Sequence, residues 1–259
     1  MSTVGGPSPL ADPQALPLLP ATAVTSFGPT LVIAPHQDDE SLGCGGAIAL
    51  LRRAGIPVAV LFVSDGTGSH PNSRAYPPQR LRDTRETEAL AALGLLGVSA
   101  ASAIFLRLPD TAVPRPGQAD FVATAARVGA ALDRTAPQTI LLPWRRDPHC
   151  DHRAAWELVH AALVGRATRP RLLEYPIWVW ELAGVGDLPL SGEVTGWRLA
   201  IDAVLPRKAA AIAAHRSQTT ALIDDDPNGF RLLPDVLAHF ADPWEIFLES
   251  PDPATREAR

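Results

Sequence analysis

The chain has 259 residues, of which 46% are hydrophobic and 20% charged, and its formal net charge is −5. This composition excludes a largely disordered chain, because enough apolar surface is present to form a core. The slightly negative and thinly spread charge disfavours a nucleic-acid partner or a polybasic membrane anchor, both of which need clustered Lys and Arg.

No apolar run approaches the roughly 18 residues of a membrane span, so we expect no transmembrane segment. The N-terminus lacks a basic stretch ahead of an apolar run and is broken by prolines, which disfavours a signal peptide. We therefore expect a cytoplasmic protein. The two cysteines, Cys44 and Cys150, are too few for a disulfide scaffold. The sequence carries no signal of its oligomeric state.

Three segments differ in character. Residues 1–28 contain five prolines and little periodicity, and we expect an extended arm on the surface or partial disorder. Residues 250–259 form a similar tail. Residues 29–249 lie between them without a linker, and we expect them to form one domain.

Within that domain, short apolar runs alternate with segments of helical periodicity. In chain order the predicted elements are a strand at 31–34, a helix around 47–51, a strand at 58–63, a helix at 80–96, a strand at 104–106, a helix at 121–132, a strand at 139–142 and a helix at 151–164. Such alternation is typical of parallel strands covered on both faces. We therefore predict an α/β fold, with a mostly parallel, Rossmann-like sheet flanked by helices in a single layered domain.

The pattern weakens after residue 170. The predicted elements there are a strand at 171–175, a loop-rich segment at 177–196, an edge strand at 197–202, a helix from Pro206 to about 215 and a turn-rich loop at 224–229. We interpret the three aspartates of that last loop as solvated rather than as a cation site.

Two polar clusters follow predicted strands. The first, at residues 35–40, contains His36, Asp38, Asp39 and Glu40, and the second, at residues 147–152, contains Asp147, His149, Asp151 and His152. Ligands of open α/β sheets bind beyond the carboxyl ends of the strands, so the clusters can share one site. Imidazole and carboxylate groups suit Zn²⁺, and a catalytic zinc usually has three protein ligands and one open position.

Structural roles are the alternative for each residue alone. Asp38 or Ser41 could cap a helix, and a single loop histidine often has no ligand. Two His/Asp clusters at separate strand ends favour a metal site over these readings. The glycines at 43–46 do not match the dinucleotide fingerprint, because Ile48 stands at its last glycine position, so a nucleotide-binding oxidoreductase is disfavoured. We expect these glycines to allow close packing between the helix and a strand.

Several motifs occur together in a fixed order. They are H-x-D-D-E at 36–40, R-x-x-E at 85–88, Pro-Asp at 109–110, H-x-D-H at 149–152 and H-x-S-Q at 215–218. Over roughly residues 30 to 220 this chain resembles the LmbE/PIG-L family of zinc-dependent N-acetylglucosaminyl de-N-acetylases. The resemblance implies a hydrolase that removes an N-acetyl group from an amino sugar or an N-acetylglucosaminyl conjugate and releases acetate.

The resemblance also implies roles for individual residues. It makes His36, Asp39 and His152 the ligands of one Zn²⁺, or of another divalent transition metal. It makes Asp38 the general base and His149 a protonated group that faces the oxyanion or the leaving amine. Asp151 would orient His149 and stabilise its charge, and Arg85 and Asp110 would hold sugar hydroxyls or an attached phosphate.

Two departures from the family pattern occur. A proline precedes His36, where the family has one after the histidine, and Cys150 replaces a proline in the second motif. We expect an altered loop at the first position and no zinc ligation by Cys150. The segments 70–79 and 177–196 match nothing in the family pattern, and these segments would set substrate identity.

A non-catalytic sugar- or metal-binding module is the alternative function. It would not need both Asp38 and the His149/Asp151 pair, so their presence favours an enzyme. Four tryptophans could stack on a sugar ring near the site, although for each one a place in the core is the more common role. They are Trp144, Trp178, Trp180 and Trp197.

Overall fold

An eight-stranded sheet forms the centre of the molecule in the computed structural model, which describes residues 8–184 and 186–251. The strands are β1 (Leu18–Leu19), β2 (Thr30–Ala34), β3 (Val58–Ser64), β4 (Ala103–Leu108), β5 (Thr139–Pro143), β6 (Arg171–Tyr175), β7 (Thr195–Ala200) and β8 (Trp244–Glu249). Their order across the sheet is β1-β7-β8-β6-β5-β2-β3-β4. All neighbouring pairs are parallel except those of β8, which runs antiparallel to β6 and β7.

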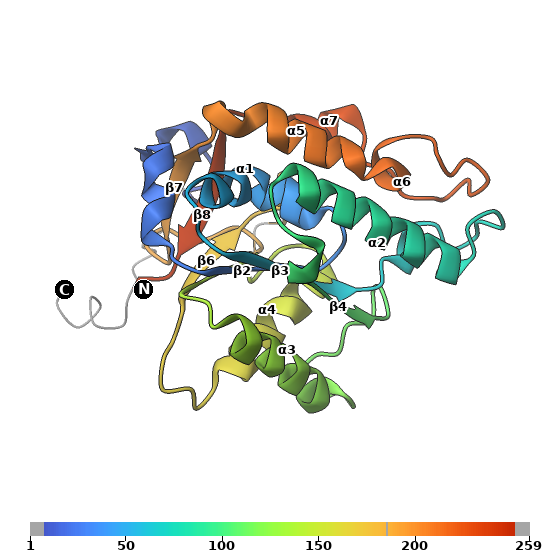
Figure 1. Ribbon diagram of the computed structural model, residues 1–259, viewed down its shortest axis with the longest axis horizontal. Coiled ribbons are helices and arrows are strands. Elements are labelled where there is room, and N and C mark those ends of the chain that lie inside the picture. The colour runs from blue at the N-terminus through green and yellow to red at the C-terminus, as the bar shows by residue number, and fades with distance from the viewer. Residues whose placement is uncertain (1–7, 185, 252–259) are drawn as a thin grey trace.

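Helices cover both faces of this sheet (Figure 1). The main helices are α1 (Asp39–Arg53), α2 (Pro78–Leu95), α3 (Phe121–Thr135), α4 (Cys150–Leu163) and α5 (Leu205–Ala214), with two short ones, α6 (Arg216–Thr219) and α7 (Pro234–Ala238). Helices α1, α2 and α5 lie on one face, and α3 and α4 lie on the other. Every residue of β2 and of β5 is buried, because parallel strands with helices on both faces have no solvated side. The predicted layered α/β fold is confirmed.

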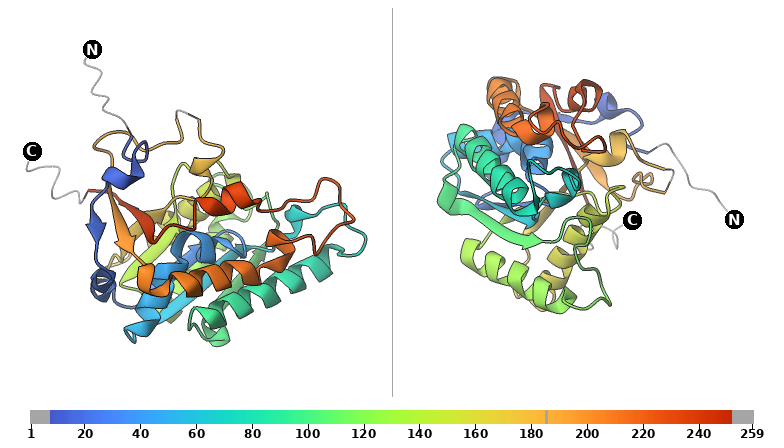
Figure 2. Two further views of the ribbon diagram at one scale, coloured as in Figure 1. Left: turned by 90° about the horizontal axis from the view of Figure 1, so that it is seen from above. Right: turned by 90° about the vertical axis from the view of Figure 1, so that its right-hand side faces the viewer.

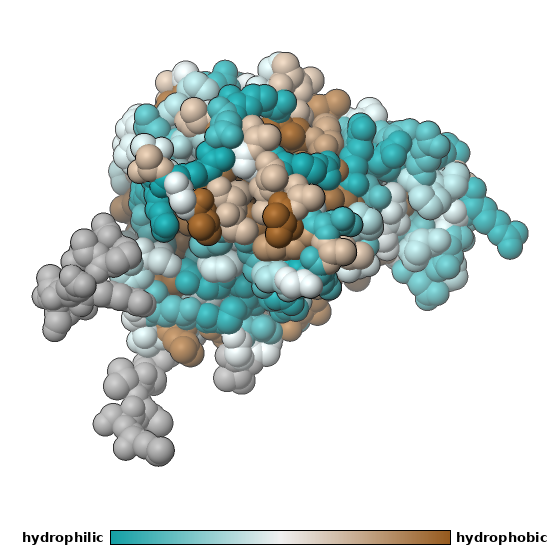
Figure 3. Space-filling model, turned by 90° about the horizontal axis from the view of Figure 1, so that it is seen from below, coloured by the Kyte–Doolittle hydropathy of each residue, from teal (hydrophilic) through white to brown (hydrophobic). Residues whose placement is uncertain are grey.

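The two helix layers cover opposite faces of the sheet. Helix α5 runs alongside α1 and α2 in the view from above (Figure 2), and the three enclose one core with the sheet. The opposite face, over α3 and α4, carries interspersed hydrophobic and hydrophilic residues (Figure 3). Isolated exposed residues such as Val122 and Val164 are normal on such a surface. Among the helices that the structure describes, none has the length and apolar character needed to cross a membrane.

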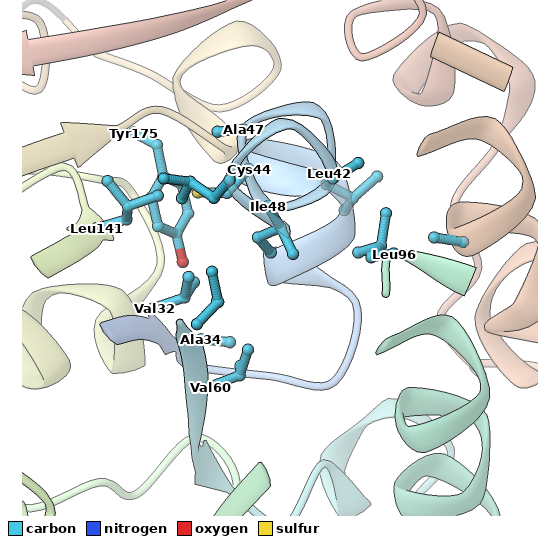
Figure 4. Close-up of a cluster of buried hydrophobic side chains, with 14 of the residues drawn as sticks. Val32, Ala34, Leu42, Cys44, Ala47, Ile48, Val60, Leu96, Leu141 and Tyr175 are labelled. Atoms are coloured by element: carbon cyan, nitrogen blue, oxygen red, sulfur yellow. The ribbon is translucent and has the colours of Figure 1, made fainter. Parts of the chain in front are cut away.

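The glycines of α1 allow that helix to lie close to its neighbours. A Cβ atom at Gly43 would lie 2.3 Å from the ring of Tyr175, and one at Gly46 would lie 2.6 Å from Ile201. Figure 4 shows Tyr175 beside α1, with its hydroxyl directed towards β2. That hydroxyl donates a hydrogen bond of 2.6 Å to the carbonyl of Ile33. The expected close packing of this glycine segment is confirmed, and it fixes α1 at the carboxyl end of β2.

The segment before β2 differs from the expected arm. From residue 8 onwards it is folded onto the domain: β1 pairs with β7, and Val24 and Phe27 are buried. The Phe27 ring makes edge-to-face contacts with Trp197 and Phe247. Apolar side chains placed between the prolines therefore anchor this segment, which the proline count alone did not indicate.

Two further expectations need correction at this side of the sheet. The strand expected at 197–202 is β7, and it is not an edge strand, because β1 bonds to one side of it and β8 to the other. Strand β8 was not expected from the sequence. Its run of buried residues is short and follows a turn, so periodicity alone did not separate it from loop.

Of the three aspartates expected to be solvated, Asp224 and Asp225 are exposed and Asp226 is buried, and the last two also connect two loops. The Asp225 carboxylate accepts hydrogen bonds from the Ser73 hydroxyl (2.6 Å) and the Arg74 backbone N–H (2.8 Å). Asp226 accepts the backbone N–H of Asn72 at 2.8 Å. Loop 224–230 is thus attached to loop 70–76, the other segment beside the site described next.

Candidate active site

The two polar clusters meet at the switch point of the sheet, where the order of the strands reverses. Strand β2 lies between β3 and β5, so the chain leaves β2 towards one side and later returns on the other. A crevice opens at such a switch point, at the carboxyl ends of the two strands. The ring centroid of His36, after β2, lies 4.6 Å from that of His149 and 5.5 Å from that of His152, both after β5. The structure therefore brings the two clusters together, as the sequence predicted.

Asp39 stands between two of these imidazoles. Its Oδ2 lies 3.3 Å from Nδ1 of His36 and 3.2 Å from Nε2 of His152. In a tetrahedral zinc site, bonds of about 2.0–2.1 Å separate the ligand atoms by about 3.3–3.4 Å. His152 is fully buried, and neither of its ring nitrogens has a hydrogen-bond partner among the described residues. The spacing of these atoms, their chemical types and the unpaired Nε2 of His152 all fit a zinc ion.

The surroundings of His36 favour a cation. Its Nε2 lies 3.2 Å from both Asp110 and Asp151, on the side of the ring away from Asp39. Burial by itself lowers the pKa of His36, but hydrogen bonds to Asp110, Asp151 and Asp39 outweigh it and raise that pKa well above its ordinary value. Burial alone would raise the pKa of Asp39, yet His152 and His36 hold it well below its usual range. Three carboxylates therefore attract positive charge to this point.

Other residue combinations at the same point also have ligand character. The three imidazoles of His36, His149 and His152 offer nitrogens within 4.8 Å of one another. Asp110 and Asp151 form a second such group with His36. Since these two carboxylates already contact Nε2 of His36, they are placed to orient that ring while its Nδ1 faces Asp39.

Asp38 is a buried carboxylate with an unusual backbone. Its φ of 156° and ψ of −29° lie in a region that L-residues rarely adopt, and such strain tends to occur at functional sites. Its Oδ2 lies 3.3 Å from Nη2 of Arg85. Burial raises the pKa of Asp38 to about 6, with Arg85 opposing the shift and Asp39 adding to it. A carboxylate with that pKa can accept a proton near neutral pH.

His149 departs from the role that the sequence suggested. It precedes α4, and its Nδ1 accepts the backbone N–H of Asp151 at 3.2 Å, so Nδ1 carries no proton. Burial, together with His36 and His152, lowers the pKa of His149 to about 4. An imidazolium does not match this hydrogen bond, because its Nδ1 would carry a proton, and the catalytic role of His149 stays a prediction. The neutral ring carries its proton on Nε2.

Asp151 contacts a different partner. Its carboxylate accepts the Nε2–H of His36 and the backbone N–H groups of Thr111 (2.8 Å) and Val113 (3.3 Å). A carboxylate oxygen of Asp151 also lies within 4.8 Å of a ring nitrogen of His149, although no hydrogen bond joins the two side chains. The Cys150 thiol contacts the Thr111 carbonyl at 3.8 Å.

Arg85 and Asp110 border the site but are largely engaged by the protein. Arg85 donates from Nη1 to the Gly66 carbonyl and from Nη2 to the Gln37 carbonyl, both at 3.0 Å. Asp110 accepts from His36 and, at 2.8 Å, from the backbone N–H of Gly68. In this structure Arg85 contacts Asp38 and Asp110 contacts His36, while their suggested contacts with sugar hydroxyls or a phosphate stay a prediction.

Asp147 has a role that the sequence analysis did not assign. This fully buried carboxylate lies 3.4 Å from Nδ1 of His152 and accepts the backbone N–H groups of His149 (3.1 Å) and Trp178 (2.9 Å). Burial would raise the pKa of Asp147, but His152 lowers it, so the carboxylate stays charged. In the sequence, the position of Asp147 within the second polar cluster was the feature that could have indicated this role.

Glu40 and His215 form a second unassigned pair. Oε1 of Glu40 lies 3.0 Å from Nε2 of His215 and accepts the Ser41 hydroxyl at 2.6 Å, with all three side chains buried. His215 belongs to the H-x-S-Q motif, and this motif was the feature of the sequence that could have indicated a role for it. The pair attaches the start of α6 to the start of α1, so it fixes the backbone next to Asp38 and Asp39.

A cavity of about 300 Å³ opens above these groups. Its charged floor consists of His36, Asp38, Asp39, Arg85, Asp110 and His149. Its large apolar lining residues, which we call the apolar wall, are Leu42, Trp178, Leu182 and Phe230. The remaining lining residues are Gly68, Ser69, Thr111 and Gln218. A cavity with a few charged groups on one side and apolar groups on the other has the character of an enzyme active site.

Of the four tryptophans considered from the sequence, Trp178 lines this cavity. Trp144 and Trp197 are buried in the core, and Trp180 stacks on His239 outside the cavity. The core role is confirmed for Trp144 and Trp197.

The fold and site define an α/β protein with an imidazole and carboxylate centre at the switch point of its sheet. A sequence model of the PIG-L family, described as GlcNAc-PI de-N-acetylase, matches residues 31–163, which contain both clusters. The chain belongs to the PIG-L family.

Known proteins resemble this chain over most of its length. A probable N-acetyl-alpha-D-glucosaminyl L-malate deacetylase 2 from Bacillus cereus is 27% identical over 208 residues, which is 75% of this chain and 86% of that protein. The N,N'-diacetylchitobiose deacetylase from Pyrococcus horikoshii superposes with a TM-score of 0.59 at 20% identity, over 74% of this chain and 71% of the other. A 4-carboxy-2-hydroxymuconate hydratase from Pseudomonas putida reaches 0.61 at 20% identity, over 88% and 97%. The two structural likenesses support the fold, and the hydratase shows that the fold also carries other chemistry.

Proposed function

We propose that this protein is a zinc-dependent hydrolase that removes the N-acetyl group from an amino sugar or an N-acetylglucosaminyl conjugate and releases acetate. The observation that carries the proposal is the position of Asp39 between His36 and His152, on the same cavity floor as Asp38 and His149. The family membership and the Bacillus cereus relative support the choice of reaction.

His36, Asp39 and His152 would hold one Zn²⁺, or another divalent transition metal. A bound zinc ion supplies Lewis acidity and lowers the pKa of a water ligand. The protein sets up these ligands through surrounding carboxylates: Asp110 and Asp151 orient His36, and Asp147 faces the far nitrogen of His152. Each ligand would therefore need little rearrangement on metal binding.

Asp38 and His149 would carry out the proton transfers and stabilise charge. Asp38 accepts the proton of the attacking water as its oxygen bonds to the amide carbon. His149, neutral and protonated on Nε2, donates a hydrogen bond to the carbonyl oxygen as negative charge develops there. Asp38 then gives its proton to the departing nitrogen, so that the products are acetate and the free amine.

The polar lining of the cavity supports a hydroxyl-rich substrate. Asp38, Arg85 and Asp110 line it, together with Ser69 and Gln218. Carboxylate, guanidinium, hydroxyl and amide groups can all form hydrogen bonds with sugar hydroxyls. An amino sugar therefore matches the polar part of the cavity.

An acetate-release assay on zinc-loaded protein tests this proposal. The panel contains N-acetylglucosamine, its glycosides and N-acetylated disaccharides, and the controls are chelator-treated protein and Asp38→Asn. We expect acetate from at least one substrate, loss of release with chelator and recovery on adding zinc. Sugar binding without acetate release from any substrate would overturn the proposal and favour the binding module.

A further inference from the structure

We propose that the apolar wall is a subsite for an apolar aglycone, an alkyl or aryl group attached to the amino sugar. This inference rests on the proposed function, because it concerns the part of the same substrate that does not react. It names a substrate class: N-acetylated amino sugars with an apolar substituent rather than free or purely polar saccharides.

Two residues of the wall expose apolar surface to solvent. Leu182 is 61% exposed and Phe230 is 37% exposed, although both line the cavity. The rings of Trp178 and Phe230 lie edge to face with centroids 5.7 Å apart. Apolar surface gathered beside charged groups usually marks a place that a ligand covers.

The wall is fixed relative to the catalytic groups. The backbone N–H of Trp178 donates to Asp147, the carboxylate that also faces His152. The backbone N–H of Phe230 donates to the Ser69 carbonyl at 2.7 Å. Asp225 and Asp226, on the loop that leads to Phe230, bind loop 70–76. A substituent on the wall would therefore keep a defined position relative to the amide over the floor.

The polarity of the cavity argues against a bare saccharide as the full ligand. The floor and Gln218 offer charged and hydrogen-bonding groups that suit hydroxyls and the acetamide. Leu182 and Phe230 offer neither donors nor acceptors, and one aromatic face is enough to stack on a sugar ring. The rest of the wall gains from contact only if an apolar group covers it, because burial of apolar surface is what stabilises such contacts.

The test compares methyl and hexyl glycosides of N-acetylglucosamine with the same anomeric configuration. We expect kcat/KM for acetate release to be roughly tenfold or more higher for the hexyl glycoside, since each added methylene in an apolar pocket gives severalfold discrimination. In Leu182→Ser and in Phe230→Ser this hexyl-to-methyl ratio should fall towards one. Leu190→Ser is the matched control, because Leu190 lies in the same loop, is 67% exposed and does not line the cavity. That variant should keep the wild-type ratio.

Calorimetric binding of hexyl glucoside, which has no acetamide, separates this inference from the proposed function. Binding that weakens at least severalfold in Leu182→Ser supports the subsite even if no acetate is ever released. Equal kcat/KM for the two glycosides, with acetate released from both, would overturn the subsite and leave the proposed function standing. A changed oligomeric state of Leu182→Ser on gel filtration, with the ratio unaltered, would assign the wall to contact between copies and also overturn the inference.

Discussion

Asp147 accepts the backbone N–H of Trp178 at 2.9 Å with one carboxylate oxygen, while its other oxygen lies 3.4 Å from Nδ1 of His152. One buried side chain thus joins a proposed metal ligand to the apolar wall of the cavity. A carboxylate beside a metal-binding histidine fixes the orientation of its imidazole. Asp147 therefore positions both the proposed ligand His152 and the wall residue Trp178.

Replacing Asp147 by Asn tests this shared support. Asn has nearly the same shape but no charge, so the imidazole of His152 loses its anionic partner. We expect zinc affinity to fall by about 10- to 100-fold, as for other groups that orient a metal ligand. Titration with zinc in the presence of a competing chelator measures this affinity. Asp133→Asn is the control, because Asp133 is an exposed carboxylate paired with Arg166, and its zinc affinity should equal that of the wild type. An unchanged affinity in Asp147→Asn would refute the role.

The two histidines of the second cluster should respond differently to substitution. His152→Ala removes a proposed ligand and should lose the metal. His149→Ala should retain the metal and lose turnover by about 10² to 10³, the usual cost of removing one oxyanion donor. Elemental analysis and acetate release on the same preparations measure the two effects. If His149→Ala loses its zinc while His152→Ala keeps it, the two histidines have the opposite roles, and His149 rather than His152 is the metal ligand.

Asp38→Asn should separate metal binding from catalysis. The amide cannot accept the proton of the attacking water, so the rate should fall by about 10² to 10⁴. The zinc content should stay at the wild-type value, because Asp38 is not one of the proposed ligands. Turnover within about threefold of the wild type, well below that range, would remove Asp38 from the role of base.

The sequence was most informative where chemistry is local. The strands β2 and β5 and the clusters that follow them could be predicted, because continuous apolar runs and adjacent polar residues are visible along the chain. The contacts between residues on different strands could not be predicted in this way. The sequence places the carboxylate of Asp151 next to His149, but its hydrogen bond to an imidazole is to His36, which lies 115 positions earlier in the chain.

Segments without a regular period were harder still. The segment at 8–28 is anchored by single apolar residues such as Phe27, and its contacts with Trp197 and Phe247 come from strands far along the chain. Phe230 likewise reaches the cavity because aspartates of its loop bind another loop. Neither arrangement leaves a pattern in the neighbouring residues, since both depend on partners more than 100 positions away.

The packing of α1 gives a prediction that does not depend on the reaction. Gly43→Ala places a methyl group 2.3 Å from the Tyr175 ring, which is fully buried and hydrogen-bonded to β2, so the ring cannot move without loss. Overpacking of this kind costs about 1–3 kcal/mol, and the free energy of unfolding should fall by that amount. Gly94→Ala is the matched control, because the new methyl at Gly94, near the end of α2, meets no atom within 4 Å. There the substitution should raise the free energy of unfolding by about 0.5–1 kcal/mol, through the higher helix propensity of Ala. Urea unfolding of both variants in the presence of chelator measures the difference, and equal values for the two would show that α1 can shift away from β6.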